Sequence, residues 1–118
     1  MATITPTYEV GTGAIVWAGI ATGDTVNESK IPAGTYVGEV KGTFNGGTSV
    51  TLLFSPKTGP TTAIKQFPTD SSPITITAAS GAFQFGPTCA GYFKPAVASG
   101  SADSITVTLV PARQASNL

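Results

Sequence analysis

Apolar and polar residues alternate with a period of two in several short stretches of the chain. In residues 35–44 the even-numbered positions are apolar or glycine, whereas the odd-numbered positions include Glu39 and Lys41. Such alternation is typical of a strand with one buried face. Residues 48–55 alternate again, and the Asn-Gly-Gly sequence at 45–47 tolerates the positive φ angles of a tight turn. The pattern therefore predicts a β-hairpin over residues 35–55.

Other short runs rich in Val, Ile, Thr and Phe are separated by Gly, Pro, Asn, Asp and Ser, and poor helix formers interrupt every long stretch. Together with the hairpin they give seven to eight strands, which predicts an all-β, antiparallel β-sandwich. Pro95 indicates an open edge or a bulge and so favours a sandwich over a closed barrel. Jelly-roll and immunoglobulin-like strand orders both fit the pattern. The further predicted strands are 14–20, 63–67, 74–78, 82–85, 91–97 and 104–110.

The two ends of the chain differ from its middle. Residues 1–13 carry Pro and Gly among Thr residues, which predicts an extended N-terminal arm, with a frayed terminus as the equal alternative. Residues 14–113 form the predicted sandwich domain, and residues 114–118 form a polar C-terminal tail. The arm supplies the candidate residues for an interface with another protein: Pro6, Tyr8 and Glu9.

Aromatic residues are the main candidates for the core. Trp17, the only tryptophan, is expected to anchor it, with contact to a binding partner as the alternative. Phe83 and Phe85 share one face of their predicted strand and are also expected inside. In the segment around Phe93, alternation places this ring in the core and its neighbours Tyr92 and Lys94 on the opposite face.

Composition excludes several classes of function. Six Lys and Arg residues balance six Asp and Glu residues, so there is no basic excess to bind nucleic acid. The chain has no His, the commonest general base and metal ligand, and no apolar run approaches the roughly 20 residues of a membrane helix. The first residues lack the charged start and apolar middle of a signal peptide. Low charge combined with ordinary hydrophobicity also argues against disorder.

Few residues could carry chemistry. Cys89 is predicted to be a small buried apolar group, because no His lies anywhere in the chain to activate its thiol. Asp24, Asp70 and Asp103 lie in Gly/Ser/Thr-rich turns, where an Asp side chain accepts hydrogen bonds from its own backbone. We therefore expect no catalytic, metal-binding or cofactor-binding residue, and no enzymatic activity.

The order of several motifs resembles one protein family. These motifs are VWAGIATGDTV (16–26), IPAGTY (31–36), VKGTFNGGTSVTLLFSP (40–56), TITAAS (75–80) and YFKPAVASGSADSITVTLVPAR (92–113). In this order they are similar to the short Thr/Gly-rich proteins from the head-gene clusters of tailed bacteriophages that look like capsid decoration (cement) proteins. The sequence SPKTGPTT (55–62) departs from the Gly/Asn/Asp-rich turn expected there.

This resemblance implies a β-sandwich, made in the host cytoplasm, that binds the outside of the virion head and staples neighbouring major capsid subunits. It further implies a homo-trimer, with no nucleic acid, membrane, cofactor or small-molecule substrate as a partner. Two other functions stay open. A carbohydrate- or receptor-binding sandwich would need an exposed aromatic platform, for example Trp17, Tyr36 or Tyr92. A neck or tail connector subunit would be present in far fewer copies per virion.

Overall fold

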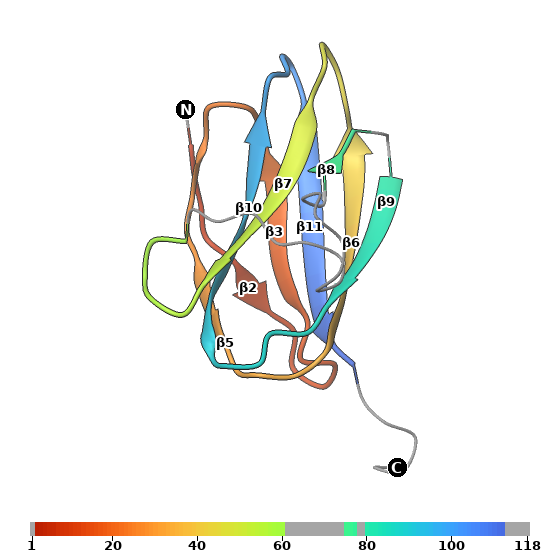
Figure 1. Cartoon of the computed structure of the whole chain (residues 1–118). Helices are drawn as coiled ribbons and strands as arrows, with labels where there is room; N and C mark the ends of the chain where they lie inside the picture. Colours follow the sequence, from red (N-terminus) through yellow and green to blue (C-terminus); the bar gives the residue numbers. More distant parts are fainter. Residues whose placement is uncertain (1, 61–74, 78–79, 113–118) are drawn as a thin grey trace.

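Two β-sheets packed face to face form the body of the protein in the computed structural model, which describes residues 2–60, 75–77 and 80–112 (Figure 1). One sheet has five strands in the order β2-β3-β11-β6-β9, the other has four in the order β5-β10-β7-β8, and β1 pairs separately with β4. The strands of the described part are β1 (Thr3–Ile4), β2 (Thr7–Tyr8), β3 (Ile15–Ile20), β4 (Thr25–Val26), β5 (Ser29–Ile31), β6 (Tyr36–Thr43), β7 (Ser49–Ser55), β8 (Thr75–Ile76), β9 (Ser80–Phe85), β10 (Gly91–Ala98) and β11 (Ser104–Pro111).

The predicted all-β, antiparallel sandwich is confirmed, but the predicted count of seven to eight strands is too low. The described residues form eleven strands. Of the strands that the pattern missed, β1, β2 and β4 have two residues each and β5 has three. Alternation with a period of two is not recognisable over so few positions.

The eight strands β3 and β5 to β11 pair in a nested order. The first of them, β3, pairs with the last, β11, and the second, β5, pairs with the seventh, β10. The third and sixth, β6 and β9, also pair, as do the fourth and fifth, β7 and β8. A nested antiparallel ribbon rolled into two facing sheets is the jelly-roll topology. Of the two strand orders that fit the sequence, the jelly roll is therefore the one observed.

The predicted hairpin over residues 35–55 is wrong. Gly46 and Gly47 do adopt positive φ angles of 71° and 90°, so the turn forms as expected. However, β6 pairs with β11 and β9 in the five-stranded sheet, whereas β7 pairs with β10 and β8 in the other sheet. The segment 45–47 therefore crosses from one sheet to the other. A crossing turn keeps the apolar face of each strand pointing inward, as a hairpin does, so alternation alone cannot distinguish the two.

Pro95 does not lie in an edge strand. It is buried in β10, which has β5 on one side and β7 on the other. Pairing with β5 ends at Phe93, however, so the hydrogen-bonded ladder on that side stops before the proline is reached. The missing N–H of Pro95 is tolerated because the strand is locally unpaired on one side, although the strand itself is internal.

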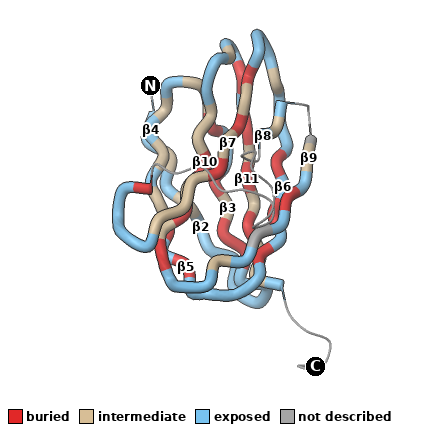
Figure 2. Tube along the Cα trace, viewed as in Figure 1, coloured by how far each residue is buried: buried red, intermediate tan, exposed pale blue. Residues whose placement is uncertain are grey.

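The core lies between the two sheets, where the buried positions of both gather (Figure 2). Trp17 is fully buried, as predicted, and its ring centroid lies 5.4 Å from that of Phe93 on the opposite sheet. Its indole N–H donates a hydrogen bond to the backbone oxygen of Asn27 at 2.8 Å. Phe83 packs on the other side of Phe93, with a centroid distance of 6.3 Å. The predicted core positions of these three rings are confirmed, and the Phe85 side chain lies outside the described part.

The N-terminal segment lies along the body of the protein (Figure 1). Strand β1 runs parallel to β4, and β2 pairs with the edge of the five-stranded sheet at β3. The Ala2 amide donates a hydrogen bond to the carboxylate of Asp24 at 2.9 Å, and Ile4 packs against the core. Residues 2–8 of the predicted arm are thus extended and paired with their own chain. The predicted strand 63–67, Asp70 and the tail 114–118 lie outside the described residues.

Candidate functional site

The described part of the chain contains no group of three or more His, Cys, Asp or Glu residues that could hold a metal ion. Every buried side-chain nitrogen and oxygen described has a hydrogen-bond partner. None of the described segments forms a helix long and apolar enough to cross a membrane. The features to consider as sites in this part of the chain are therefore one polar cluster and several surfaces.

The polar cluster surrounds Asp103 at the end of the sandwich where the loops 21–24, 45–48 and 99–103 meet. The Asp103 carboxylate accepts a hydrogen bond from the Thr22 amide at 2.8 Å and one from the Thr22 hydroxyl at 2.7 Å. It also accepts one from the Thr48 hydroxyl at 2.8 Å. Each of these bonds joins residues more than 50 positions apart, so this single side chain ties three loops together.

The surroundings of Asp103 favour its charged form. The hydrogen bond from the Thr22 amide, followed by that from the Thr22 hydroxyl, lowers the pKa of Asp103 below its usual 3.8. Gly100 closes the cluster, because a β-carbon at this position would overlap the Thr48 hydroxyl and the Asp103 carboxylate. The cluster is closed and satisfied. The prediction placed the donors to Asp103 in its own turn, but the hydrogen bonds described here come from two other loops, 21–24 and 45–48.

Asp24 is a second carboxylate that joins two segments of the chain, its own turn and the N-terminal strand. Its carboxylate accepts hydrogen bonds from the amides of Ala2 and Ala21, both at 2.9 Å. These two bonds, that from Ala2 first, lower the pKa of Asp24 below 3.8. One carboxylate thus caps its own turn and holds the N-terminal strand.

The three predicted interface residues lie side by side at one edge of the sandwich. Pro6 is half-buried, whereas Glu9 is exposed and accepts a hydrogen bond from the Thr12 hydroxyl at 3.3 Å. Tyr8 is 63% exposed, and its hydroxyl shares a 2.6 Å hydrogen bond with that of the buried Ser29. Since Tyr8 belongs to β2 and Ser29 to β5, this bond joins the edges of the two sheets. Tyr8 offers one face of its ring for contact while its hydroxyl is already engaged.

The end of the sandwich opposite to Asp103 includes Glu9 and adjoins Tyr8. We call it the lower end because it lies at the bottom of Figure 1. Backbone hydrogen bonds hold its loops together, from Gly34 to Pro87 at 3.1 Å and from Ala112 to Thr35 at 2.8 Å. Val10 is fully exposed there, and among the described residues of this end Glu9 carries the only charge. The lower end consists of residues 9–13, 32–35, 86–90 and 111–112.

Cys89 belongs to this lower end and is exposed, so its predicted burial is wrong. The residue follows Gly86 and Pro87 in the loop that joins β9 to β10. The alternation that indicates burial in a strand does not apply inside a loop. The prediction for Cys89 therefore depended on the general tendency of cysteine to be buried. The thiol is free at the surface.

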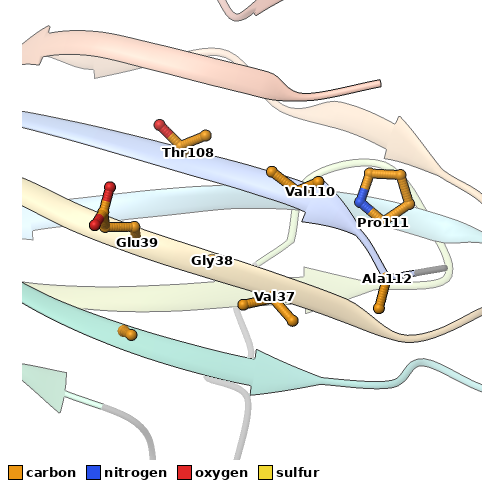
Figure 3. A pocket seen from close by; sticks show the side chains of 8 residues that line it. Val37, Gly38, Glu39, Thr108, Val110, Pro111 and Ala112 are labelled. Atoms are coloured by element: carbon orange, nitrogen blue, oxygen red, sulfur yellow. The ribbon is translucent and has the colours of Figure 1, made fainter. Parts of the chain in front are cut away.

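The outer face of the five-stranded sheet is a second apolar surface. A shallow open groove of about 420 Å³ runs along it between β11, β6 and β9 (Figure 3). Val37 is 47% exposed on this face, beside Val110 and Pro111 of the neighbouring strand. The only ion pair described in the structure lies on the same face, between Glu39 and Lys41 at 3.5 Å.

Sequence reasoning missed this face, although a signal was present. Val37 occupies an outward position in a strand whose other outward residues include Glu39 and Lys41, and Val110 occupies an outward position after Thr106 and Thr108. Apolar residues at outward positions of two strands indicate a surface patch once the strands are known to be neighbours. That neighbour relation, between β6 and β11, is supplied only by the fold.

The aromatic platform that a carbohydrate-binding site would need is not formed by the residues proposed for it. Trp17 and Tyr36 are buried at 0% and 3% exposure, and the Tyr36 hydroxyl donates to the Pro32 oxygen at 2.6 Å. Tyr92 is half-buried.

Comparison with protein-family models, with curated proteins and with solved structures found no match to this chain.

Proposed function

We propose that this protein is a non-enzymatic structural protein that binds the outside of a tailed-phage head and staples neighbouring major capsid subunits. The proposal rests on the family resemblance of the sequence motifs and on one structural observation. That observation is the lower end of the sandwich, which exposes Val10 and carries Glu9 as its only charge.

An uncharged surface is suited to burial against another protein. Charged groups are depleted in the centres of protein interfaces, because removing them from water without pairing them costs free energy. Across the lower end only the Glu9 carboxylate has to be compensated, and the remaining residues are Gly, Ala, Pro, Thr, Val and the exposed Cys89. Tyr8 adds an exposed aromatic ring beside it.

A staple also has to be stiff, so that force on one capsid subunit reaches the next. The sandwich has a continuous core between its sheets, and Asp103 fastens the loops at the far end. Grouping of the copies as trimers would add avidity, because three weak contacts act together once the first has formed. In this proposal the major capsid protein binds the lower end and the adjoining residues Pro6, Tyr8 and Glu9.

The test compares two charge substitutions at opposite ends of the molecule. Val10→Glu places a second carboxylate on the lower end, and Ala98→Glu places one at the opposite end, where β10 stops. Both side chains are exposed, so neither change should lower the free energy of unfolding by more than about 0.5 kcal/mol. Purified heads lacking the protein are incubated with each variant, sedimented, and assayed for bound copies per major capsid subunit.

We expect the wild type and Ala98→Glu to bind in high copy number and Val10→Glu to bind at least about tenfold more weakly, since an unpaired buried charge costs more than 1.4 kcal/mol. Equal binding of both variants would contradict the lower end as the attachment surface. Failure of the wild type to sediment with heads would contradict the proposed function itself. A number of bound copies per particle that corresponds to a single ring would favour a neck or tail connector.

A further inference from the structure

The strand register places the outward residues of the five-stranded sheet in rows that run across the strands. Thr108 of β11 pairs with Val16 of β3 on one side and with Glu39 of β6 on the other, and Glu39 pairs with Ala82 of β9. One row therefore reads Thr7, Val16, Thr108, Glu39, Ala82, with Thr7 of β2 at its end. The next row holds Val110 and Val37 side by side, with the exposed Gln84 of β9 next to Val37. The neighbours of these residues along each strand are mostly buried, so the rows themselves face outward.

This face differs from the outer face of the four-stranded sheet. The latter presents Lys30 and Lys94, which have the buried residues Ser29, Ile31, Phe93 and Pro95 as their strand neighbours. On the five-stranded sheet the described charges of the central rows, Glu39 and Lys41, neutralise each other at 3.5 Å. The outer face of the four-stranded sheet thus carries two lysines, with Asp24 beside Lys94, whereas the outer face of the five-stranded sheet carries Val37, Val110 and one described ion pair.

The rows become complementary to themselves under a two-fold rotation. Consider a two-fold axis that runs parallel to the strands, midway between β6 and β11 and just outside the sheet. Rotation by 180° about this axis places a second copy face to face with the first, so that β6 of one copy lies over β11 of the other. Val37 then faces Val110, Glu39 faces the Thr108 hydroxyl, and Ala82 faces Val16 of that second copy. At these positions apolar residues meet apolar ones and the carboxylate meets a hydrogen-bond donor, and the polar side chains of Lys41 and Gln84 lie on the same face. A surface that matches itself in this way forms a closed, isologous contact.

We propose that two copies of this chain associate through the outer faces of their five-stranded sheets. The contact adds a sheet-on-sheet layer of the kind already present inside each sandwich, with the sheets about 10 Å apart. This inference does not depend on the proposed function, because it concerns the isolated chain. It is also separate from a threefold grouping, which requires a different symmetry axis and a different surface.

The size of the face indicates the strength of the contact. Four strands at about 4.8 Å spacing and seven residues at about 3.4 Å rise cover roughly 19 by 24 Å, or about 450 Å² of projected area per copy. Stable protein complexes bury about 800 Å² per partner. We therefore expect a weak, concentration-dependent dimer that is populated mainly where many copies are held close together.

Cross-linking can identify this arrangement, because Val16 and Ala82 lie on opposite sides of the proposed two-fold axis, on β3 and β9. The two residues are three strand spacings apart in one chain, about 14 Å, yet they face each other across the proposed contact. In a Cys89→Ser background, Val16→Cys and Ala82→Cys are made as separate chains of different mass. A short bis-maleimide is added to each chain alone and to the equimolar mixture.

In the mixture, the Val16→Cys chain cross-linked to the Ala82→Cys chain is expected to be at least about fivefold more abundant than the product of either chain with itself. In the proposed dimer two identical cysteines lie about 14 Å apart sideways, which is too far for a short cross-linker, whereas the two different cysteines face each other. Adding Val37→Lys to both chains should lower the yield about tenfold or more, since each lysine would be buried against Val110. A fold check by denaturant unfolding accompanies each variant.

Equal yields in the mixture and in the single-variant samples, from folded chains, would overturn the proposal. It would also be overturned if sedimentation of the wild type showed only monomer up to millimolar concentration. If Val37→Lys left the cross-linking yield unchanged but reduced binding to phage heads, the face would belong to a capsid contact and the two-fold pairing would be wrong.

Discussion

Asp103 offers the most direct test of how the loops of this jelly roll are held. Substitution by Ala removes the acceptor of three hydrogen bonds, with distances of 2.7 to 2.8 Å. The Thr48 hydroxyl can turn to the Asn45 oxygen, which lies 2.9 Å away. The amide and hydroxyl of Thr22 lose their acceptor inside the loop cluster. Two unsatisfied groups at about 1–3 kcal/mol each would cost about 2–6 kcal/mol, and because Thr22 is only half-buried we expect the lower part of this range, about 2–4 kcal/mol.

Asp103→Asn should be milder than Asp103→Ala, at about 1 kcal/mol. The Asn side chain keeps one oxygen acceptor, and its amide can donate to hydroxyls that reverse their direction. The loss is then mainly that of the charge assistance in the hydrogen bonds. Urea unfolding followed by Trp17 fluorescence measures both variants. With an m-value of about 2 kcal/mol/M, the Ala variant should unfold at about 1–2 M lower urea.

The pH dependence follows from the same hydrogen bonds. The pKa of Asp103 is lower in the folded protein than the value near 3.8 of an exposed Asp, so the unfolded chain binds the proton more readily. The stabilisation by the carboxylate is complete well above pH 4, and it is lost as the pH falls through the folded-state pKa. The stability difference between wild type and Asp103→Asn should therefore shrink on acidification.

Two results would refute this reasoning. One is an Ala variant within about 0.5 kcal/mol of the wild type, as expected for the surface control Glu39→Ala. The other is a stability difference between wild type and the Asn variant that stays constant from pH 7 to pH 2, measured by the same urea titration at each pH.

Three further outcomes are expected. Gly42→Ala should destabilise the fold by more than about 2 kcal/mol in urea, because Gly42 has a φ of 140° and a β-carbon there would overlap the Ser104 oxygen. Trp17→Phe should lower the free energy of unfolding by about 2–4 kcal/mol, since it leaves a cavity and removes the donor to the Asn27 oxygen. An unchanged melting temperature in calorimetry would contradict the central place of this ring in the core. Cys89 should react with a thiol reagent at the same rate in native and unfolded protein, and a native rate slowed about a hundredfold would contradict its exposure.

Period-two alternation was sufficient to predict the long strands and the direction of their side chains. Phe93 is buried where the alternation placed it, and Glu39 and Lys41 are exposed, whereas the burial of Trp17 was predicted from its residue type. The pattern reports on burial, and burial is a property of each strand by itself. It says nothing about which strand lies alongside, so the connection at 45–47 was assigned to a hairpin although it crosses between sheets.

The same limit explains what sequence could predict of the candidate surfaces. Turn composition correctly indicated that Asp24 accepts a hydrogen bond from its own turn, but it did not indicate that Asp103 receives its hydrogen bonds from loops of two other connections. The arm residues Tyr8 and Glu9 were identified from their position in the chain alone. The apolar face around Val37 and Val110 forms only when β6 and β11 become neighbours, which requires the complete topology.

The nested topology also constrains how the protein is made. Strand β11 is synthesised last, yet it lies between β3 and β6, and Leu109 has Ile15 as its register partner. The growing chain must therefore keep a vacant position between two earlier strands until residues 104–111 leave the ribosome. Pairing over such long sequence separations is slow. Chaperones would meet a nascent chain with exposed strand edges, and a chain terminated before residue 104 would lack an internal strand of the five-stranded sheet.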